Sequence, residues 1–166
     1  AVLHSKENLR KLCRIRKRWW GTIFFWRSKN RFEKSYFFSG YDCDSLALDG
    51  ITSFVESFFP IFEKNRNGIL ELRTKSTQIH KILKYKPIDN CIIAFSFTPE
   101  NISKLVEHKA PSVKKKIIAM KKLANAGWKL GLRFDPIIPA CNFAKIYENL
   151  FKNIAANINE KNLHSI

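Results

Sequence analysis

The stretch PSVKKKIIAMKKLANAGWKLGLRFD, residues 111–135, joins a helical pattern to a strand pattern and sets the fold of the chain. Its apolar residues with helical spacing are Val113, Ile117, Met120 and Ala124. Ser112 is a preferred N-cap residue, and Gly127 is the residue type that most often ends a helix in a left-handed conformation. Residues 128–134 (WKLGLRF) are typical of a strand. We therefore predict a helix followed by a strand.

The same alternation continues on both sides of this stretch. Strands are predicted at residues 35–40, 69–74, 91–97 and 128–134. Helices are predicted at 46–63, 76–83, from 98 onward, 111–126 and 143–157. Alternating strands and helices favour parallel strands with right-handed crossovers. Four such units make half of an eightfold barrel or a complete small open sheet, so we expect an α/β fold with about four parallel strands over residues 34–166, and the residues alone leave both arrangements open.

Local signals refine three helix boundaries. Ser76 is a plausible N-cap for the short helix, and Thr98 followed by Pro99 resembles a preferred helix start. Pro60, near the end of the helix at 46–63, predicts a kink or an early stop.

The chain is strongly basic, with 30 Lys and Arg against 14 Asp and Glu and a net charge of +16. Such a charge favours nucleic acid, an acidic membrane surface or an acidic protein as partner. Residues 1–33 form a distinct basic aromatic segment, in which RIRKRWWGTIFFWRSKNR occupies residues 14–31. The apolar part, residues 19–26, is far shorter than the roughly 20 residues of a membrane-spanning helix. We expect no transmembrane segment, no signal peptide and a cytoplasmic location.

The cysteines give no metal motif. Cys13, Cys43, Cys91 and Cys141 are widely spaced and form no CxxC or Cys/His cluster, so no metal site is predicted from them. Cys91 begins the apolar run CIIAF and is expected in the core. A P-loop, GxGxxG and HExxH are absent from the sequence, which gives a conventional hydrolase little support.

Polar residues follow each predicted strand, at residues 40–44, 73–75, 96–100 and 133–135. The carboxyl ends of parallel strands meet at one edge of a sheet, so these residues should form one mixed-charge rim. An acidic cluster of Asp42, Asp44 and Asp135 that binds a cation is an open alternative at this rim.

Five phrases along the chain, SGYDCDSLALD, LELRTKS, AFSFTPE, HKAPSVKKKIIAMKKLANAGW and GLRFDPII, resemble the spore photoproduct lyase family of radical S-adenosylmethionine enzymes. The resemblance covers residues 35–157. It implies a partial barrel that binds a four-iron four-sulfur cluster and S-adenosylmethionine. It also implies that a 5′-deoxyadenosyl radical reverts a crosslinked thymine dimer in DNA.

The resemblance assigns residues to the cofactor pocket. Lys75 in RTKS matches the family lysine that contacts the carboxylate of S-adenosylmethionine, and Ser96 in AFSF matches a serine of the same pocket. Cys43 takes the position of another pocket serine. Tyr41 takes the position of the hydrogen-donating cysteine, so Tyr41 and Cys43 are both candidates for a catalytic role.

The family motif CxxxCxxC, which holds the cluster, is absent from these 166 residues. The leading hypothesis is therefore a truncated segment of such a barrel, without a cluster of its own, with neither cofactor bound by this chain alone, and without independent activity. One alternative is a split enzyme, in which a partner chain carrying CxxxCxxC supplies the missing barrel parts. Another is a basic nucleic-acid-binding module, for which DNA is the expected partner.

Overall fold

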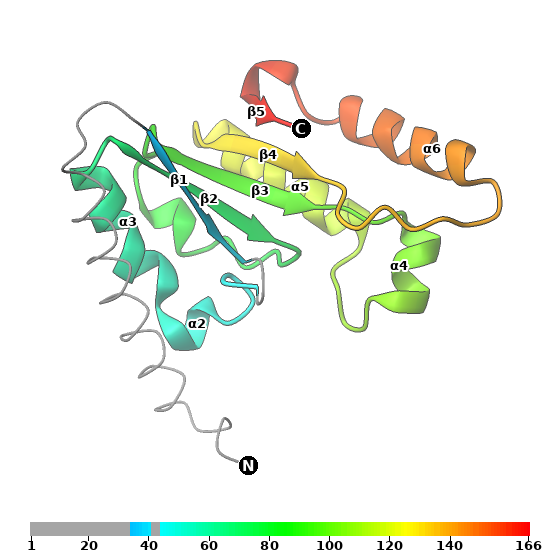
Figure 1. The fold of residues 1–166 in the computed structure, drawn as a ribbon, viewed down its shortest axis with the longest axis horizontal. Helices are drawn as coiled ribbons and strands as arrows, with labels where there is room; N and C mark the ends of the chain where they lie inside the picture. Colours follow the sequence, from blue (N-terminus) through cyan, green and yellow to red (C-terminus); the bar gives the residue numbers. More distant parts are fainter. Residues whose placement is uncertain (1–33, 41–43) are drawn as a thin grey trace, which may run out of the picture.

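A computed structural model describes residues 34–40 and 44–166, and within these residues the fold is one parallel sheet with helices between its strands (Figure 1). The strands are β1 (Ser35–Ser39), β2 (Gly68–Thr74), β3 (Cys91–Ser96), β4 (Lys129–Arg133) and β5 (Leu163–Ser165). They are neighbours in sequence order, and every pair is parallel. This confirms the α/β class and the partial barrel.

The connections between the strands are mostly helical. They are α2 (Asp49–Thr52), α3 (Phe54–Lys64), the 3₁₀ turn η1 (Ile82–Lys84), α4 (Glu100–Val106), α5 (Val113–Asn125), α6 (Phe143–Ala155) and the 3₁₀ turn η2 (Glu160–Asn162). No helix in the described part of the chain has the length and apolar character needed to cross a membrane.

The core lies between one face of the sheet and the helices. Alternate strand residues such as Leu72, Phe95 and Leu132 point into it, together with side chains of α3, α5 and α6. Cys91 is fully buried there, as predicted. Side chains alternate between the two faces of a strand, so the residues between them point to the opposite face. That second face carries Glu71, Arg73 and Arg133.

The boundaries of α5 agree with the sequence prediction. The Ser112 side chain accepts a hydrogen bond from the Lys115 amide at 3.4 Å, and Ser112 is the N-cap. Gly127 has a φ of +87°, the left-handed conformation expected after the helix. Both signals act within one turn of the helix, so sequence alone is enough to find them.

The predicted helix at 46–63 is two helices. The chain turns at Ser53, where φ is +53°, and α3 begins at Phe54. The Asp49 carboxylate accepts the Val55 amide at 3.0 Å and so fixes this junction. The predicted early stop at Pro60 was wrong, because Pro60 lies inside α3 and the helix continues to Lys64.

Two further helix predictions were wrong at their starts. Residues 76–83 form no α-helix, and only η1 is present, because the Ser76 hydroxyl accepts the Gln78 amide in a local turn. Thr98 is not the N-cap of α4, since Pro99 occupies that position and the Thr98 hydroxyl donates to Glu107. Strand β5 was not predicted, because three half-exposed residues give no hydrophobic run.

Candidate functional site at the carboxyl ends of the strands

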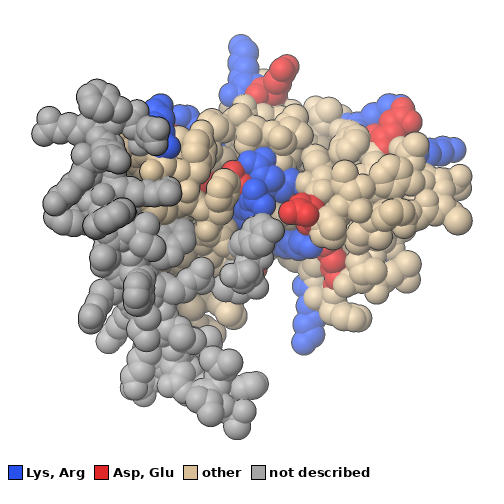
Figure 2. Space-filling model, viewed as in Figure 1, with Lys and Arg blue, Asp and Glu red and all other residues tan. Residues whose placement is uncertain are grey.

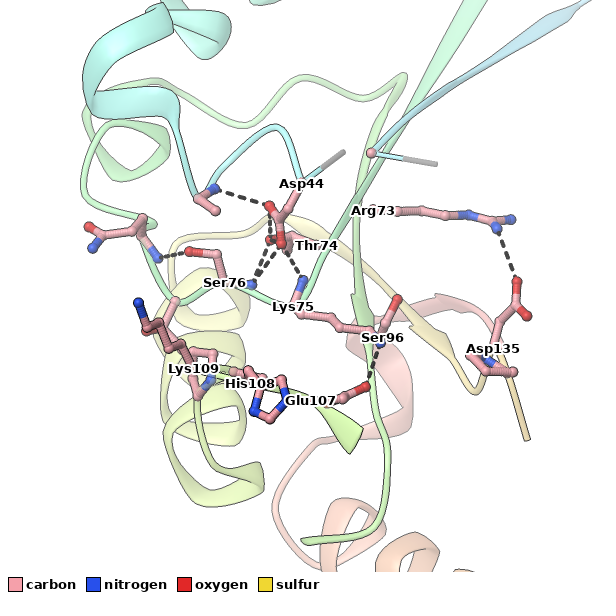
Figure 3. Close-up of a pocket in the computed structure, with 17 residues that line it drawn as sticks. Asp44, Arg73, Thr74, Lys75, Ser76, Ser96, Glu107, His108, Lys109 and Asp135 are labelled. Carbon is pink, nitrogen blue, oxygen red and sulfur yellow. Dashed lines mark hydrogen bonds and ion pairs between the residues drawn. The ribbon is translucent and has the colours of Figure 1, made fainter. Parts of the chain in front are cut away.

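A cavity of about 770 Å³ lies at the carboxyl ends of the strands (Figure 3). Its polar lining comes from the loop after β1 (Asp44), the end of β2 (Arg73, Thr74, Lys75, Ser76), the end of β3 (Ser96), the loop after α4 (Glu107, His108, Lys109) and the loop after β4 (Asp135). The predicted mixed-charge rim is thus confirmed for Asp44, residues 73–75, Ser96 and Asp135, which all line the cavity. Its size suits a nucleotide-sized ligand.

Asp44 joins the loop after β1 to the end of β2. One carboxylate oxygen accepts the amides of Leu46 and Ala47, both at 3.0 Å. The other accepts the amides of Lys75 at 2.7 Å and Ser76 at 3.1 Å. The Thr74 hydroxyl donates to the same carboxylate at 2.8 Å. Asp44 therefore fixes the backbone on which Lys75 is mounted.

Gly40 allows this close approach of the two strand ends. Its φ is +91°, and a Cβ at this position would lie 2.1 Å from the Arg73 carbonyl oxygen. Only glycine fits there without a shift of the backbone.

Lys75 and Glu107 form an ion pair inside the cavity. The Lys75 ammonium lies 2.5 Å from the Glu107 carboxylate, and the two side chains are 36% and 10% exposed. Glu107 also accepts hydrogen bonds from the hydroxyls of Thr98 and Ser103, each at 2.8 Å. Burial alone would raise the pKa of Glu107, but the bonds from Lys75, Thr98 and Ser103 outweigh it and lower the pKa below its usual value. Glu107 therefore positions the Lys75 ammonium at the cavity wall.

Ser96 lies at the end of β3 with a buried lysine behind it. The Lys116 ammonium donates to the Ser96 carbonyl at 3.0 Å and lies 5.6 Å from the centre of the Phe97 ring. Lys116 is 1% exposed, and burial lowers its pKa. This lysine comes from α5 and fixes the strand end that carries Ser96.

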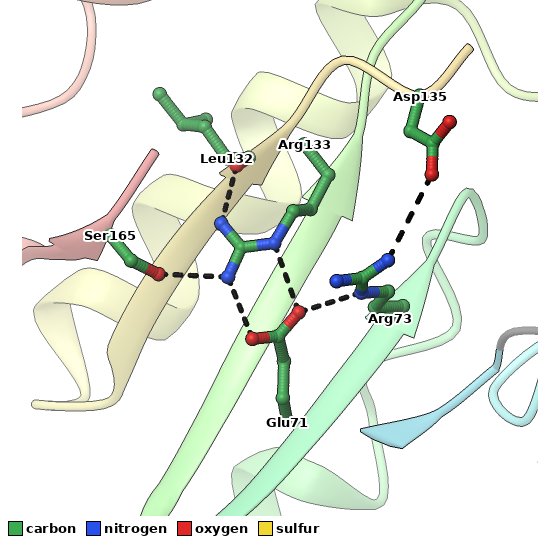
Figure 4. Close-up of polar contacts among 6 residues, drawn as sticks. All are labelled: Glu71, Arg73, Leu132, Arg133, Asp135 and Ser165. Carbon is green, nitrogen blue, oxygen red and sulfur yellow. Dashed lines mark hydrogen bonds and ion pairs between the residues drawn. The ribbon is translucent and has the colours of Figure 1, made fainter. Parts of the chain in front are cut away.

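A second charged cluster lies on the sheet face away from the core (Figure 4). Buried Glu71 accepts Arg133 at 2.9 and 2.7 Å and the Nε of Arg73 at 2.7 Å. Burial opposes ionisation of Glu71, yet the bonds from Arg133 and Arg73 lower its pKa below the usual value. The Arg73 guanidinium reaches the cavity, where its Nη1 lies 3.9 Å from an Asp135 oxygen.

The acidic cation site is not formed by the described residues. All the bonds of Asp44 come from internal donors, and Asp135 lies beside an arginine. No group of three or more His, Cys, Asp or Glu residues suited to a metal is found in residues 34–40 and 44–166. Tyr41, Asp42 and Cys43 lie outside the described residues, as does the basic segment 1–33.

Sequence reasoning placed Lys75 and Ser96 at the site but missed Glu107, Lys116 and the Glu71 cluster. Glu107 lies 32 residues from Lys75, and no local pattern connects the two. A signal for Glu71 was available, because it interrupts the apolar strand GILELRT on the face away from the core.

The comparisons with known proteins agree with one another. The model of the family "Spore photoproduct lyase" matches residues 26–166. The spore photoproduct lyase of Clostridium acetobutylicum is 24% identical over 120 residues, which cover 72% of this chain and 36% of that protein. Spore photoproduct lyase complexed with dinucleoside spore photoproduct is a similar solved structure, with a TM-score of 0.75 and 22% identity over 83% of this chain and 42% of that one.

A double mutant of spore photoproduct lyase with bound AdoMet and dinucleoside spore photoproduct gives a TM-score of 0.77 and 22% identity, covering 86% of this chain and 44% of that one. The chain thus spans roughly two fifths of the length of these relatives. The family model covers most of the present sequence. The chain belongs to the spore photoproduct lyase family.

Proposed function

We propose that this chain supplies the S-adenosylmethionine-binding wall of a radical lyase related to spore photoproduct lyase, acting in the cytoplasm. The observation that carries the proposal is the Lys75 ammonium, held by Glu107 at the wall of a cavity that Ser96 also lines. An ammonium so placed pairs with a ligand carboxylate as a compact point charge. The α-carboxylate of S-adenosylmethionine is such a group.

The described residues fit S-adenosylmethionine but not the iron–sulfur cluster. The cavity has room for the cofactor, with Lys75 for its carboxylate and Ser96 as a further polar contact. Cys91 is buried in the core and burial raises its pKa, while Cys141 is exposed elsewhere, so these two thiols do not make a cluster site. Cluster-bound S-adenosylmethionine supplies the radical in this family.

The proposal assigns the cluster to residues outside this sequence, either in a longer form of the same chain or in a partner chain with CxxxCxxC. Cys43 is proposed as a third contact of the cofactor, and Tyr41 and Cys43 as the two candidates for hydrogen donation. The reaction would revert a thymine photoproduct in DNA. The 166 residues alone are proposed to bind the cofactor without cleaving it.

Calorimetric titration with S-adenosylmethionine tests the role of Lys75. Lys75→Met should weaken binding about tenfold or more, because a charge-assisted contact is lost. Glu107 keeps its bonds from Thr98 and Ser103 in this variant, so the wall should remain folded. The matched control is Lys122→Met, which removes an exposed lysine on α5 and should leave the affinity unchanged. Equal affinities of wild type and Lys75→Met would contradict the proposal.

Anaerobic reconstitution with iron and sulfide tests the assignment of the cluster. The chain alone should show neither the broad absorbance of a four-iron cluster nor cleavage of S-adenosylmethionine. Stoichiometric cluster formation would contradict the proposal, and co-purification with a CxxxCxxC protein would support its split form.

A second candidate function is nucleic-acid binding without chemistry, favoured by the net charge of +16. Exposed lysines of α5 offer phosphate contacts, namely Lys114, Lys115, Lys121 and Lys122. The face shown in Figure 2 instead mixes acidic and basic side chains near its centre. This function requires a DNA affinity that falls steeply with salt and has no preference for ultraviolet-damaged duplex. A flat salt response would exclude it.

A further inference from the structure

The two arginines that bind Glu71 differ in how many of their guanidinium nitrogens have a hydrogen-bond partner. Every nitrogen of the Arg133 guanidinium has a partner, since Nη1 donates to the Leu132 carbonyl at 2.6 Å and Nη2 also donates to the Ser165 hydroxyl at 2.9 Å. Arg73 donates to Glu71 through Nε alone. Among the described residues its two terminal nitrogens have no hydrogen bond, and Nη1 lies 3.9 Å from an Asp135 oxygen.

The terminal nitrogens of the Arg73 guanidinium are oriented toward the cavity by two contacts. Glu71 anchors it through Nε, and the guanidinium carbon lies 5.1 Å from the centre of the Phe38 ring. The side chain is only 22% exposed, and Arg73 lines the cavity together with Lys75. A guanidinium fixed at one edge and against an aromatic face presents its remaining N–H groups as a ready fork.

The charges of the cluster leave a surplus cation at the cavity. One buried carboxylate, Glu71, stands against the two guanidinium groups of Arg73 and Arg133. Asp135 offsets this surplus weakly, because its side chain is 67% exposed and its distance from Arg73 exceeds that of a hydrogen bond. The cavity therefore contains an oriented, incompletely paired arginine.

We propose that Arg73 binds a phosphate group of the ligand beside the cofactor position, and that Asp135 is the internal counter-ion which this phosphate displaces. A phosphate oxygen pair matches the terminal nitrogens of a guanidinium. The high positive charge of the chain adds attraction for polyanions. Assigning this phosphate to a substrate rests on the proposed function, whereas the binding itself rests on the geometry of Arg73 alone.

The phosphate has two sources, a nucleic-acid phosphodiester or a small phosphorylated molecule. Two probes separate them: inorganic phosphate, and the dinucleoside monophosphate of two thymidines. Both are titrated into the chain without S-adenosylmethionine, and binding is followed by nuclear magnetic resonance of the backbone amides near Arg73. The probe that binds more tightly identifies the source.

Two substitutions should act in opposite directions on the tighter probe. Arg73→Gln should weaken it about tenfold or more, because the charged fork is lost. Asp135→Asn should strengthen it by about two- to fivefold, because a competing negative charge is removed. The matched control Arg66→Gln removes an equal charge from an exposed residue in the turn before β2, roughly 20 Å from Arg73, and should change the affinity less than about twofold.

Two checks separate a loss of phosphate binding from a loss of folding. Glu71 keeps both bonds from Arg133 in Arg73→Gln, so circular dichroism should match that of the wild type. Asp135→Asn retains both arginines and provides the test if Arg73→Gln fails to fold. Unchanged affinity in Arg73→Gln, or weaker binding in Asp135→Asn, would overturn the proposal. The proposed function is tested separately by Lys75→Met with S-adenosylmethionine, so failure of the phosphate site and failure of the cofactor site are distinguishable.

Discussion

Asp44→Asn should lower the free energy of unfolding far more than the same substitution at an exposed aspartate. Asp44 accepts two amides on each carboxylate oxygen. Asn retains one acceptor oxygen, so either orientation of its amide turns an NH₂ group toward two backbone donors. Hydrogen bonds to a charged acceptor contribute about 1.5–3 kcal/mol each, so the lower bound for two is about 3 kcal/mol.

One alternative acceptor reduces this cost. The Ser76 amide also lies 2.8 Å from the Thr74 hydroxyl oxygen, which remains in the variant. We therefore expect a loss of about 2–3 kcal/mol in the free energy of unfolding. For a chain of this length that corresponds to a fall in Tm of about 5–10 °C.

Urea denaturation followed by circular dichroism measures this loss. The matched control is Asp89→Asn, an exposed position whose carboxylate has no hydrogen bond or ion pair with the described residues, and it should change stability by less than about 0.5 kcal/mol. If Asp44→Asn fell within the same range as this control, the account of Asp44 as the clamp of the β2 end would be refuted.

Two other substitutions test the electrostatics of the site and the packing of the sheet. Glu107→Gln should lower the free energy of unfolding at neutral pH, and by a smaller amount at about pH 3. A carboxyl whose pKa is lowered in the folded state stabilises the fold above its ordinary pKa, and this contribution is lost as the pH falls through the folded pKa. An equal loss of unfolding free energy at both pH values in urea denaturation would contradict this. Gly131→Ala should lower the free energy of unfolding by about 1–3 kcal/mol in the same assay, since the new Cβ would lie 3.0 Å from the Cβ of Ala94. The control Gly50→Ala, with open space around it, should be neutral or stabilising. A Gly131→Ala chain as stable as the wild type would disprove the close contact.

Sequence alone predicted those features of the fold that depend on neighbours along the chain. The cap at Ser112 and the stop at Gly127 involve bonds across three to five residues, and short runs rich in apolar residues identified four of the strands. The failed helix at residues 76–83 has a long-range cause in addition to its local turn. Asp44 lies about 30 residues from the β2 end and holds its amides, so residues 76–83 start from a fixed turn rather than a helix.

The candidate site, like the fold, was predictable from the sequence only in part. The rim followed from the rule that parallel strands end at one edge, and the resemblance supplied Lys75 and Ser96. Glu107 and Lys116 were missed, since a glutamate and a lysine among many charged residues carry no local signature of burial. The contacts of Tyr41 and Cys43 with the cofactor stay predictions.

The formal charges of the cavity conceal which groups are available to a ligand. Asp44 and Glu107 are acids at its wall, yet each already accepts at least three internal hydrogen bonds. Lys75 has three N–H donors and gives one to Glu107, while Arg73 retains its terminal fork. Asp44 and Glu107 are therefore structural, whereas Lys75 and Arg73 retain unused donors. Under the two proposals, a cavity with balanced residue charges would select anionic ligand groups at two points, a carboxylate at Lys75 and a phosphate at Arg73.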